Sequence, residues 1–256
     1  IPVDSEHFSI DQLTRNYKDT DIEKIYLTAS GGPFLNKPLK SFKSIKASDA
    51  IKHPKWKMGK KISIDSSNLM NKVLEIIEAY RLFPFKIDKY EIIIHPQSLV
   101  HAIVHFKNGQ TRFLYHETDM KIPISNAIFE NDFDHKNFIY PKKDILKKFE
   151  NLQFIKVDKK RFPIVTLLKK FSNNNSGPII LNASNETLVS KFIKGKISFN
   201  SIFFYLRSVL GHKHFKKYAI KRSPNINEIY EIDNWARTKT HELVRRKFVW
   251  KIFYIL

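Results

Sequence analysis

The chain contains no cysteine and is poor in glycine and methionine, with 7 and 3 of them among 256 residues. Without cysteine the protein can form no disulfide, no thiolate metal site and no cysteine nucleophile. No apolar run approaches the roughly 18 residues that a membrane-spanning helix needs, so no membrane partner is expected. With 42% hydrophobic and 27% charged residues, the composition is that of a folded protein with a sizeable core.

Acidic residues are also scarce: 25 Asp and Glu stand against 45 Lys and Arg, which gives a formal charge of +20. Such an excess attracts polyanions, and a basic nucleic-acid-binding protein is one alternative interpretation. The cations are spread over several stretches, however, and most are lysines, whereas surfaces that read bases rely on arginine. We therefore interpret the charge as solvated surface and expect no nucleic-acid partner.

Short apolar segments at residues 1–3, 24–27 and 61–64 each run into a turn of small polar residues and then into a helical pattern. This alternation predicts strands of an α/β sheet, which binds its ligands at the carboxyl ends of neighbouring strands. Residues 69–80 show helical spacing, and residues 90–94, 99–106 and 111–115 predict strands, the last two joined by an Asn108-Gly109 hairpin.

From residue 162 onward the pattern is helical, over 164–171, 185–193, 201–209 and 233–248. The predicted fold class is therefore an α/β (α+β) catalytic domain with a mixed sheet, followed by an all-α C-terminal helical bundle. We place the catalytic domain at 1–128, a linker at 129–160 and the helical domain at 161–256.

Asp4 and Glu6 flank Ser5 near the start of the chain, and Glu75 lies on the predicted helix 69–80. Two carboxylates at one turn repel each other unless a cation lies between them, and oxygen ligands of this kind suit Mg²⁺ or Mn²⁺. The alternative is an ordinary helix start, with Asp4 or Ser5 as the cap and Glu6 in the first turn.

Hydroxyl, amide and cationic side chains suited to a phosphate ester occur after the other two apolar segments. They are Ser30, Ser66, Asn71, Lys72 and His53. Residues 53–59, with Trp56 and Met58, have the composition of a mobile lid or of a surface loop anchored by Trp56. His95 stands alone at a strand end, where a packed or hydrogen-bonded histidine is the commoner role.

Taken together, these segments resemble the 1-deoxy-D-xylulose 5-phosphate reductoisomerase family, in the family's order and across nearly the whole chain. The resemblance rests on residues 2–7 (PVDSEH), 30–34 (SGGPF), 53–62 (HPKWKMGKKI), 65–66 (DS), 70–72 (MNK), 95–98 (HPQS), 119–120 (DM) and 181–186 (LNASNE).

The resemblance implies roles for single residues. Asp4, Glu6 and Glu75 fall on the family's divalent-metal ligands. Substrate-binding positions are Ser5, Ser30, His53, Trp56, Ser66, Asn71 and Lys72. The implied catalytic residues are Lys72, His53 and His95, and the implied positions near the cofactor are Met58, Gly59 and Met120.

The activity implied is the rearrangement of 1-deoxy-D-xylulose 5-phosphate and its reduction by NADPH to 2-C-methyl-D-erythritol 4-phosphate, in non-mevalonate isoprenoid synthesis. The family implies Mg²⁺ or Mn²⁺ as the metal and a homodimer as the assembly. It also implies a plastid-type, apicoplast-like organelle if the source is eukaryotic and the cytoplasm otherwise.

Two departures from the family pattern qualify this expectation. The chain has no Gly-x-Gly-x-x-Gly motif, so we expect the NADPH-binding domain to be missing from it and this chain alone to be inactive. Val73 stands where the family commonly has glycine after the Asn-Lys pair, which leaves an inactive structural homologue as a further alternative.

Overall fold

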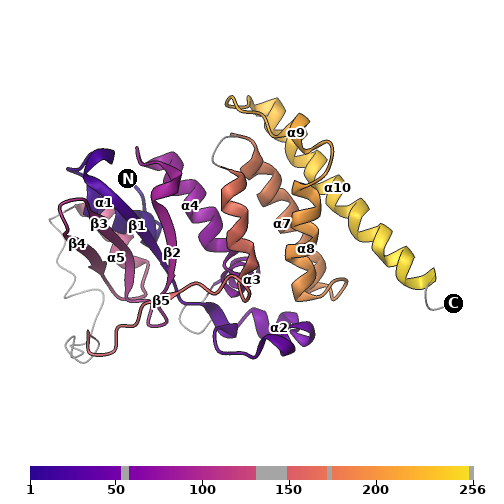
Figure 1. Ribbon diagram of the computed structural model, residues 1–256, viewed down its shortest axis with the longest axis horizontal. Helices are drawn as coiled ribbons and strands as arrows, with labels where there is room; N and C mark the ends of the chain where they lie inside the picture. The colour runs from indigo at the N-terminus through magenta and orange to yellow at the C-terminus, as the bar shows by residue number, and fades with distance from the viewer. Residues whose placement is uncertain (53–57, 131–148, 172–174, 254–256) are drawn as a thin grey trace. The chain divides into compact units, whose positions relative to one another are not determined.

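The computed structural model describes residues 1–52, 58–130, 149–171 and 175–253, with side chains described as far as residue 246 (Figure 1). The chain forms two compact units. The first holds Ile1–Gly32 and Asn71–Asp158, and the second holds Pro33–Lys52, Met58–Met70 and Lys159–Leu256.

The first unit is built on a five-stranded mixed sheet in the order β4-β3-β1-β2-β5. Its strands are β1 (Ile22–Ala29), β2 (Tyr90–Ile94), β3 (Val100–Phe106), β4 (Thr111–Tyr115) and β5 (Ile155–Lys156). β1 pairs in parallel with β2, with Ala29 opposite Ile94, and the other pairs are antiparallel. The predicted mixed sheet is confirmed, and so is the hairpin, where Gly109 takes the positive φ of 85° that such a turn requires.

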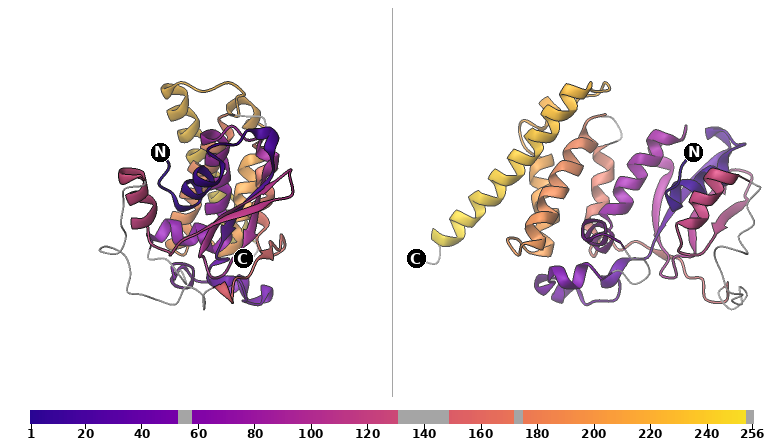
Figure 2. Two further views of the ribbon diagram at one scale, coloured as in Figure 1. Left: turned by 90° about the vertical axis from the view of Figure 1, so that its left-hand side faces the viewer. Right: turned by 180° about the vertical axis from the view of Figure 1, so that it is seen from behind.

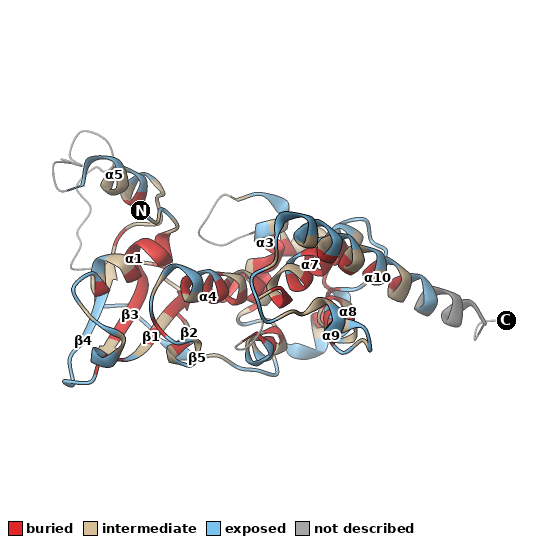
Figure 3. Ribbon diagram, turned by 90° about the horizontal axis from the view of Figure 1, so that it is seen from above, coloured by how far each residue is buried: buried red, intermediate tan, exposed pale blue. Residues whose placement is uncertain are grey.

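Helices α1 (Ser5–Thr14), α4 (Met70–Leu82) and α5 (Lys121–Phe129) complete this unit, with the 3₁₀ turns η1 (Asp19–Asp21) and η4 (Ile87–Lys89). α1 packs against β1, β3 and β4. The central strands are buried along most of their length, as Figure 3 shows in red. Ile25, Leu27 and Val104 are fully buried, which explains why these strands read as apolar runs.

Two of the three predicted strand-to-turn segments are wrong. Residues 1–3 form no strand, and Asp4 instead begins α1 as its cap. Residues 61–64 lie in helix α3 (Lys60–Asn68), where Ile64 is fully buried. The alternation Lys-Ile-Ser-Ile suggested a strand. In the structure the Ser63 hydroxyl donates a hydrogen bond to the carbonyl of Gly59, four residues earlier, as a serine inside a helix can.

The second unit is helical, which confirms the predicted bundle. Its elements are η2 (Gly32–Phe34), η3 (Leu39–Ser44), α2 (Ala47–Ala50), α3, η6 (Pro163–Lys170), α7 (Gly177–Ile193), α8 (Phe199–Leu210), α9 (Phe215–Tyr218) and α10 (Ile226–Phe253). α7 packs against both α8 and α10, and the right-hand view of Figure 2 shows the long helix α10, in yellow, along its length.

Residues 33–52 and 58–70 belong to this helical unit, although the sequence placed them within the catalytic domain at 1–128. The physical reason is an aromatic cluster. The rings of Phe34 and Phe42 lie 5.2 and 6.1 Å from the ring of Phe199 on α8, and Arg161 donates to the carbonyl of Phe34 at 2.8 Å. The three predicted domain ranges stay a prediction, and most of the proposed linker lies outside the described residues.

Among the described residues, no helix is both long enough and apolar enough to cross a bilayer.

Candidate metal and substrate site

The start of α1 brings two of the predicted metal ligands together. Asp4 caps the helix, because its Oδ1 accepts from the backbone N–H groups of Glu6 at 3.1 Å and His7 at 3.4 Å. This is the ordinary capping role that was the alternative interpretation. Capping also fixes the Asp4 carboxylate beside the first turn, so the cap is compatible with the metal-ligand role, which stays a prediction.

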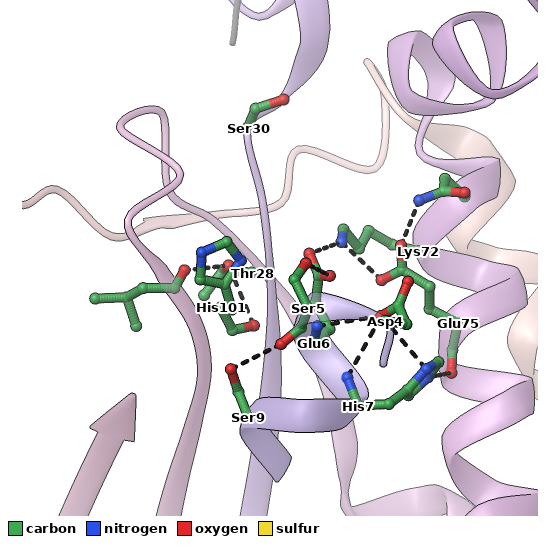
Figure 4. A network of polar contacts seen from close by, with 12 residues as sticks. Asp4, Ser5, Glu6, His7, Ser9, Thr28, Ser30, Lys72, Glu75 and His101 are labelled. Atoms are coloured by element: carbon green, nitrogen blue, oxygen red, sulfur yellow. Dashed lines mark hydrogen bonds and ion pairs between the residues drawn. The ribbon is translucent and has the colours of Figure 1, made fainter. Parts of the chain in front are cut away.

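Glu75 joins these residues from α4. Asp4, Glu6 and Glu75 each offer a carboxylate oxygen, and the three oxygens lie within 4.8 Å of one another. Figure 4 shows the three side chains converging from the two helices. Glu6 and Glu75 are buried, whereas the side chain of Asp4 is 43% exposed. The cluster therefore has two carboxylates in the interior and one at its open side.

Lys72 lies between the two buried carboxylates. Its ammonium forms ion pairs with Glu6 Oε1 and, at 2.6 Å, with Glu75 Oε2. Asn71 donates to the other oxygen of Glu75, and Ser5 donates its hydroxyl to the other oxygen of Glu6. The predicted neighbourhood of Asn71, Lys72 and Glu75 on one helix is thus present in the structure.

The pKa values of the three carboxyl groups are shifted in different directions. Burial and then the charge of Glu6 raise the pKa of Asp4 to about 6. Burial also opposes ionisation of Glu6, but the Lys72 ammonium prevails and lowers the pKa of Glu6 to about 2. For Glu75, burial and then the charge of Glu6 raise the pKa well above its ordinary value. The cluster holds more negative charge than one ammonium neutralises, which is what a divalent cation would relieve.

His7 is a site residue that the sequence argument missed. Its ring is fully buried, its Nε2 lies 2.9 Å from the carbonyl oxygen of Glu75, and its Nδ1 lies 3.4 Å from Asp4 Oδ1. It therefore ties α1 to α4 behind the carboxylates. The only sequence signal was its position three residues after Asp4, on the same face of a helix.

His101 and His116 form a second buried pair that the sequence did not reveal. Their rings stack at 3.8 Å, and His101 Nε2 lies 3.3 Å from the carbonyl oxygen of His116. Burial, followed by the neighbouring His116, lowers the pKa of His101 to about 3. The ring is therefore neutral at physiological pH, and Figure 4 shows it on the side of Glu6 opposite α4.

Ser30 and His95 follow the parallel strands β1 and β2 at the same edge of the sheet. The backbone N–H of His95 donates to the carbonyl of Ala29 at 2.7 Å, and Ser30 Oγ accepts from the N–H of Gly32 at 3.1 Å. His95 is fully buried, stacks on Phe154 at 4.8 Å and has its Nδ1 2.8 Å from the carbonyl oxygen of Gln153.

The other ring nitrogen of His95 is available. Within the described part of the chain, His95 Nε2 has no hydrogen-bond partner. Burial lowers the pKa of His95, which favours the neutral form of the ring. Such a nitrogen can accept or donate one hydrogen bond to a ligand.

The remaining predicted site residues lie apart from this cluster in the chain. Ser66 is partly exposed on α3, where Met58 and the exposed Gly59 precede the helix, all within the helical unit. Met120, in the first unit, is partly exposed and precedes α5. His53 and Trp56 lie outside the described residues. The roles of all these residues stay predictions.

Asp65, the residue before Ser66, is held by a hydrogen bond and an ion pair. Asp65 is buried, accepts from Asn185 Nδ2 on α7 at 2.9 Å and pairs with Lys61 at 2.9 Å. Asn185 belongs to the LNASNE segment that carried part of the resemblance. That segment therefore holds α3, and with it Ser66, against α7.

Comparison with known proteins agrees with the family resemblance seen in the sequence. Residues 1–83 match a family model described as the 1-deoxy-D-xylulose 5-phosphate reductoisomerase C-terminal domain, and residues 116–239 match one described as the DXP reductoisomerase C-terminal domain. Relatives named 1-deoxy-D-xylulose 5-phosphate reductoisomerase include one from Pelagibacter ubique, 45% identical over 93% of this chain and 61% of its own length. One from Treponema denticola is 42% identical over 93% and 60%.

Solved structures give the same result. A DOX-P reductoisomerase described as in complex with NADPH, fosmidomycin and magnesium superposes with a TM-score of 0.87 at 31% identity, over 95% of this chain and 63% of that one. The Zymomonas mobilis enzyme, described as in complex with NADPH, gives 0.83 at 31%, over 95% and 61%. The chain spans about three-fifths of the length of the curated relatives it matches. It belongs to the 1-deoxy-D-xylulose 5-phosphate reductoisomerase family, whose C-terminal domains it matches.

Proposed function

We propose that this chain carries the metal- and substrate-binding part of a 1-deoxy-D-xylulose 5-phosphate reductoisomerase, which isomerises that substrate and reduces it to 2-C-methyl-D-erythritol 4-phosphate. The observation that carries the proposal is the convergence of Asp4, Glu6 and Glu75, with one oxygen of each within 4.8 Å of the others. The descriptions of the solved relatives, which name NADPH and magnesium, support the same cofactors here.

The donor set fits a hard divalent cation. Three carboxylate oxygens, two of them from buried side chains, suit Mg²⁺ or Mn²⁺ better than a softer metal. Asp4, Glu6 and Glu75 would hold the ion, which when bound polarises a substrate oxygen as a Lewis acid. The chain supplies the positioning: Ser5 and Asn71 each hold one oxygen of a glutamate, and His7 locks the backbone at Glu75.

Within the first unit, we assign the substrate phosphate and its neighbouring hydroxyls to Ser30, Asn71 and Lys72. Ser66 and His53 are further substrate-binding positions that the residue types and the resemblance predict. Holding the phosphate fixes the reacting carbons relative to the carboxylates, and that orientation lowers the barrier to rearrangement. His95 offers its buried, neutral Nε2 as a hydrogen-bonding group for the substrate. Trp56 would cover the substrate, and Met58, Gly59 and Met120 would lie near the nicotinamide.

Two broader features belong to the same proposal. A homodimer is the assembly that we expect from the family. A plastid-type organelle is expected only if the source is eukaryotic, and the relatives named above are bacterial.

Titration with Mn²⁺ tests the metal assignment. The substitution Glu75→Gln removes one of the three charges and a ligand oxygen, so Mn²⁺ affinity should fall by about 100-fold or more in calorimetry. A phosphonate hydroxamate, which joins a metal-chelating group to a phosphate-like end, should bind the unmodified chain only when Mn²⁺ is present.

Glu91→Gln is the matched control, because Glu91 is an exposed carboxylate of the same unit that pairs with Lys24. It should leave Mn²⁺ binding unchanged. The proposal fails if Glu75→Gln binds Mn²⁺ as tightly as the unmodified chain, or if the hydroxamate binds equally well without metal.

A further inference from the structure

Lys72 stands out within the carboxylate cluster because it is a buried cation placed on the proposed metal ligands. Its side chain is only 10% exposed, and its ammonium pairs with Glu6 and Glu75 together. Burial alone would lower the pKa of Lys72, but the charges of Glu6, Glu75 and Asp4 raise it above its ordinary value. The two ion pairs therefore place a positive charge directly on the proposed metal ligands.

The four oxygens of the two glutamates all have a donor. Lys72 supplies the donor for Glu6 Oε1 and Glu75 Oε2, while the uncharged Ser5 and Asn71 supply it for Glu6 Oε2 and Glu75 Oε1. A divalent cation bound to these oxygens would lie beside two uncharged donors, the hydroxyl and the amide, and one charged donor, the ammonium. The hydroxyl and the amide can turn or share an oxygen, but the ammonium repels the cation directly.

Lys72 is also one of the residues assigned to the substrate phosphate. It lies in the first turn of α4 beside Asn71, and its flexible stem carries a compact charge that can bind phosphate as well as carboxylate. One side chain is thus shared between the anion-binding half and the cation-binding half of the site. A shared charge of this kind couples the two halves thermodynamically.

We infer that Lys72 is an internal counter-ion that competes with the divalent cation for Glu6 and Glu75, and that an anion which draws its ammonium away raises the affinity of the site for the metal. This inference rests on the proposed function, because it takes Asp4, Glu6 and Glu75 as the metal ligands. By reciprocity the bound metal also raises the affinity for the anion, so each ligand prepares the site for the other.

The test measures Mn²⁺ binding by electron paramagnetic resonance, with and without methylphosphonate as a simple phosphate-like dianion. In the unmodified chain, methylphosphonate should tighten Mn²⁺ binding by about fivefold or more, the lower range of measured couplings between sites. In Lys72→Met the competing charge is gone, so Mn²⁺ alone should bind about tenfold more tightly. Methylphosphonate should then have little further effect.

Lys24→Met is the matched control, since Lys24 is a lysine of the same unit that pairs with the exposed Glu91 and lies on β1. It removes the same formal charge and should leave both affinities unchanged. Lys72→Arg keeps the positive charge and should bind Mn²⁺ no more tightly than the unmodified chain.

The inference is overturned if Lys72→Met binds Mn²⁺ equally or more weakly, or if the effect of methylphosphonate survives in that variant. If the variant does not fold, the unmodified chain still decides, because an Mn²⁺ affinity that methylphosphonate leaves unchanged also overturns the inference. A failure of the proposed function has a different signature, namely no Mn²⁺ binding by the unmodified chain or no loss of binding in Glu75→Gln.

Discussion

At Val73 the chain departs from the family pattern, and the structure shows what the departure does. Val73 is fully buried in α4, one residue after Lys72, and α4 runs without interruption from Met70 to Leu82. The side chain is thus part of the core, and Glu75 still reaches Asp4 and Glu6. The structure therefore gives no support for a disrupted helix at this position.

Restoring glycine should weaken the protein. Val73→Gly removes a buried side chain and places glycine inside a helix, and together these changes should lower the free energy of unfolding by about 2 to 3 kcal/mol. Urea unfolding followed by circular dichroism measures the change. Val73→Ala, which keeps a good helix former, should lose less; a glycine variant as stable as the original would mean that Val73 is strained.

Asp4 shows how far single residues could be predicted. Its residue type and position allowed both a helix cap and a metal ligand, and the structure uses its carboxylate to cap α1 while holding it near Glu6 and Glu75. Sequence spacing placed Asn71, Lys72 and Glu75 together correctly, because helical neighbours follow from local geometry. His7 escaped notice, since its partner Glu75 lies 68 residues away.

At the scale of elements, the stacked pair of His101 on β3 and His116 beyond β4 makes stability depend on pH. The pKa of His101 is about 3 in the folded protein, against an ordinary value of 6.5. Because the folded pKa is lowered, the unfolded chain takes up the proton first as the pH falls. The stabilisation from the neutral ring is full above the unfolded pKa and is lost progressively between pH 6.5 and about 3.

The lowered pKa of His101 should therefore reduce the free energy of unfolding by about 3 kcal/mol between pH 7 and pH 4. Urea unfolding at several pH values should show a shallower acid dependence in His101→Gln than in the unmodified chain. His105→Gln, on the same strand but outside the core, is the control and should leave the slope unchanged. Equal slopes in all three proteins would contradict the buried neutral histidine.

Elements whose pattern is local were predicted, and those fixed by distant partners were not. The hairpin needs only Asn108 and Gly109, and α4 has a clear apolar period. Residues 61–64 of α3 were taken for a strand because their apolar and polar residues alternate. The contact that anchors α3 comes from Asn185, which bonds to Asp65 from 120 residues away and leaves no local signal. His53 and Trp56, predicted to lie in a lid, are outside the described residues, so that interpretation stays a prediction.

For the whole molecule, the formal charge of +20 predicts self-repulsion in the compact state. Raising NaCl from about 0.05 to about 0.5 M shortens the Debye length from well over 10 Å to about 4 Å, and should raise the Tm by about 3 °C. Differential scanning calorimetry measures the shift. A falling Tm would instead show that exposed ion pairs, such as Lys24 with Glu91, outweigh the repulsion.

A change in salt concentration also tests the alternative that the protein binds nucleic acid. A true nucleic-acid-binding surface loses affinity for duplex DNA steeply as salt rises, with a slope set by the number of phosphates contacted.

The sequence predicted the total charge of the molecule but not where the charged side chains lie in space. In the structure some basic side chains bind partners within the protein. Lys72 forms ion pairs with Glu6 and Glu75. Arg161 donates hydrogen bonds to the carbonyls of Phe34 and Lys37.

The two compact units alternate along the chain, with boundaries that include 32/33, 70/71 and 158/159. A single recombination breakpoint therefore cannot take one unit whole from one gene and the other unit whole from a related gene. Any crossover within residues 1–158 separates pieces that must be inherited together to rebuild one core. We therefore expect shuffling libraries built from this chain and its relatives to yield folded chimeras mainly when both units come together from one parent.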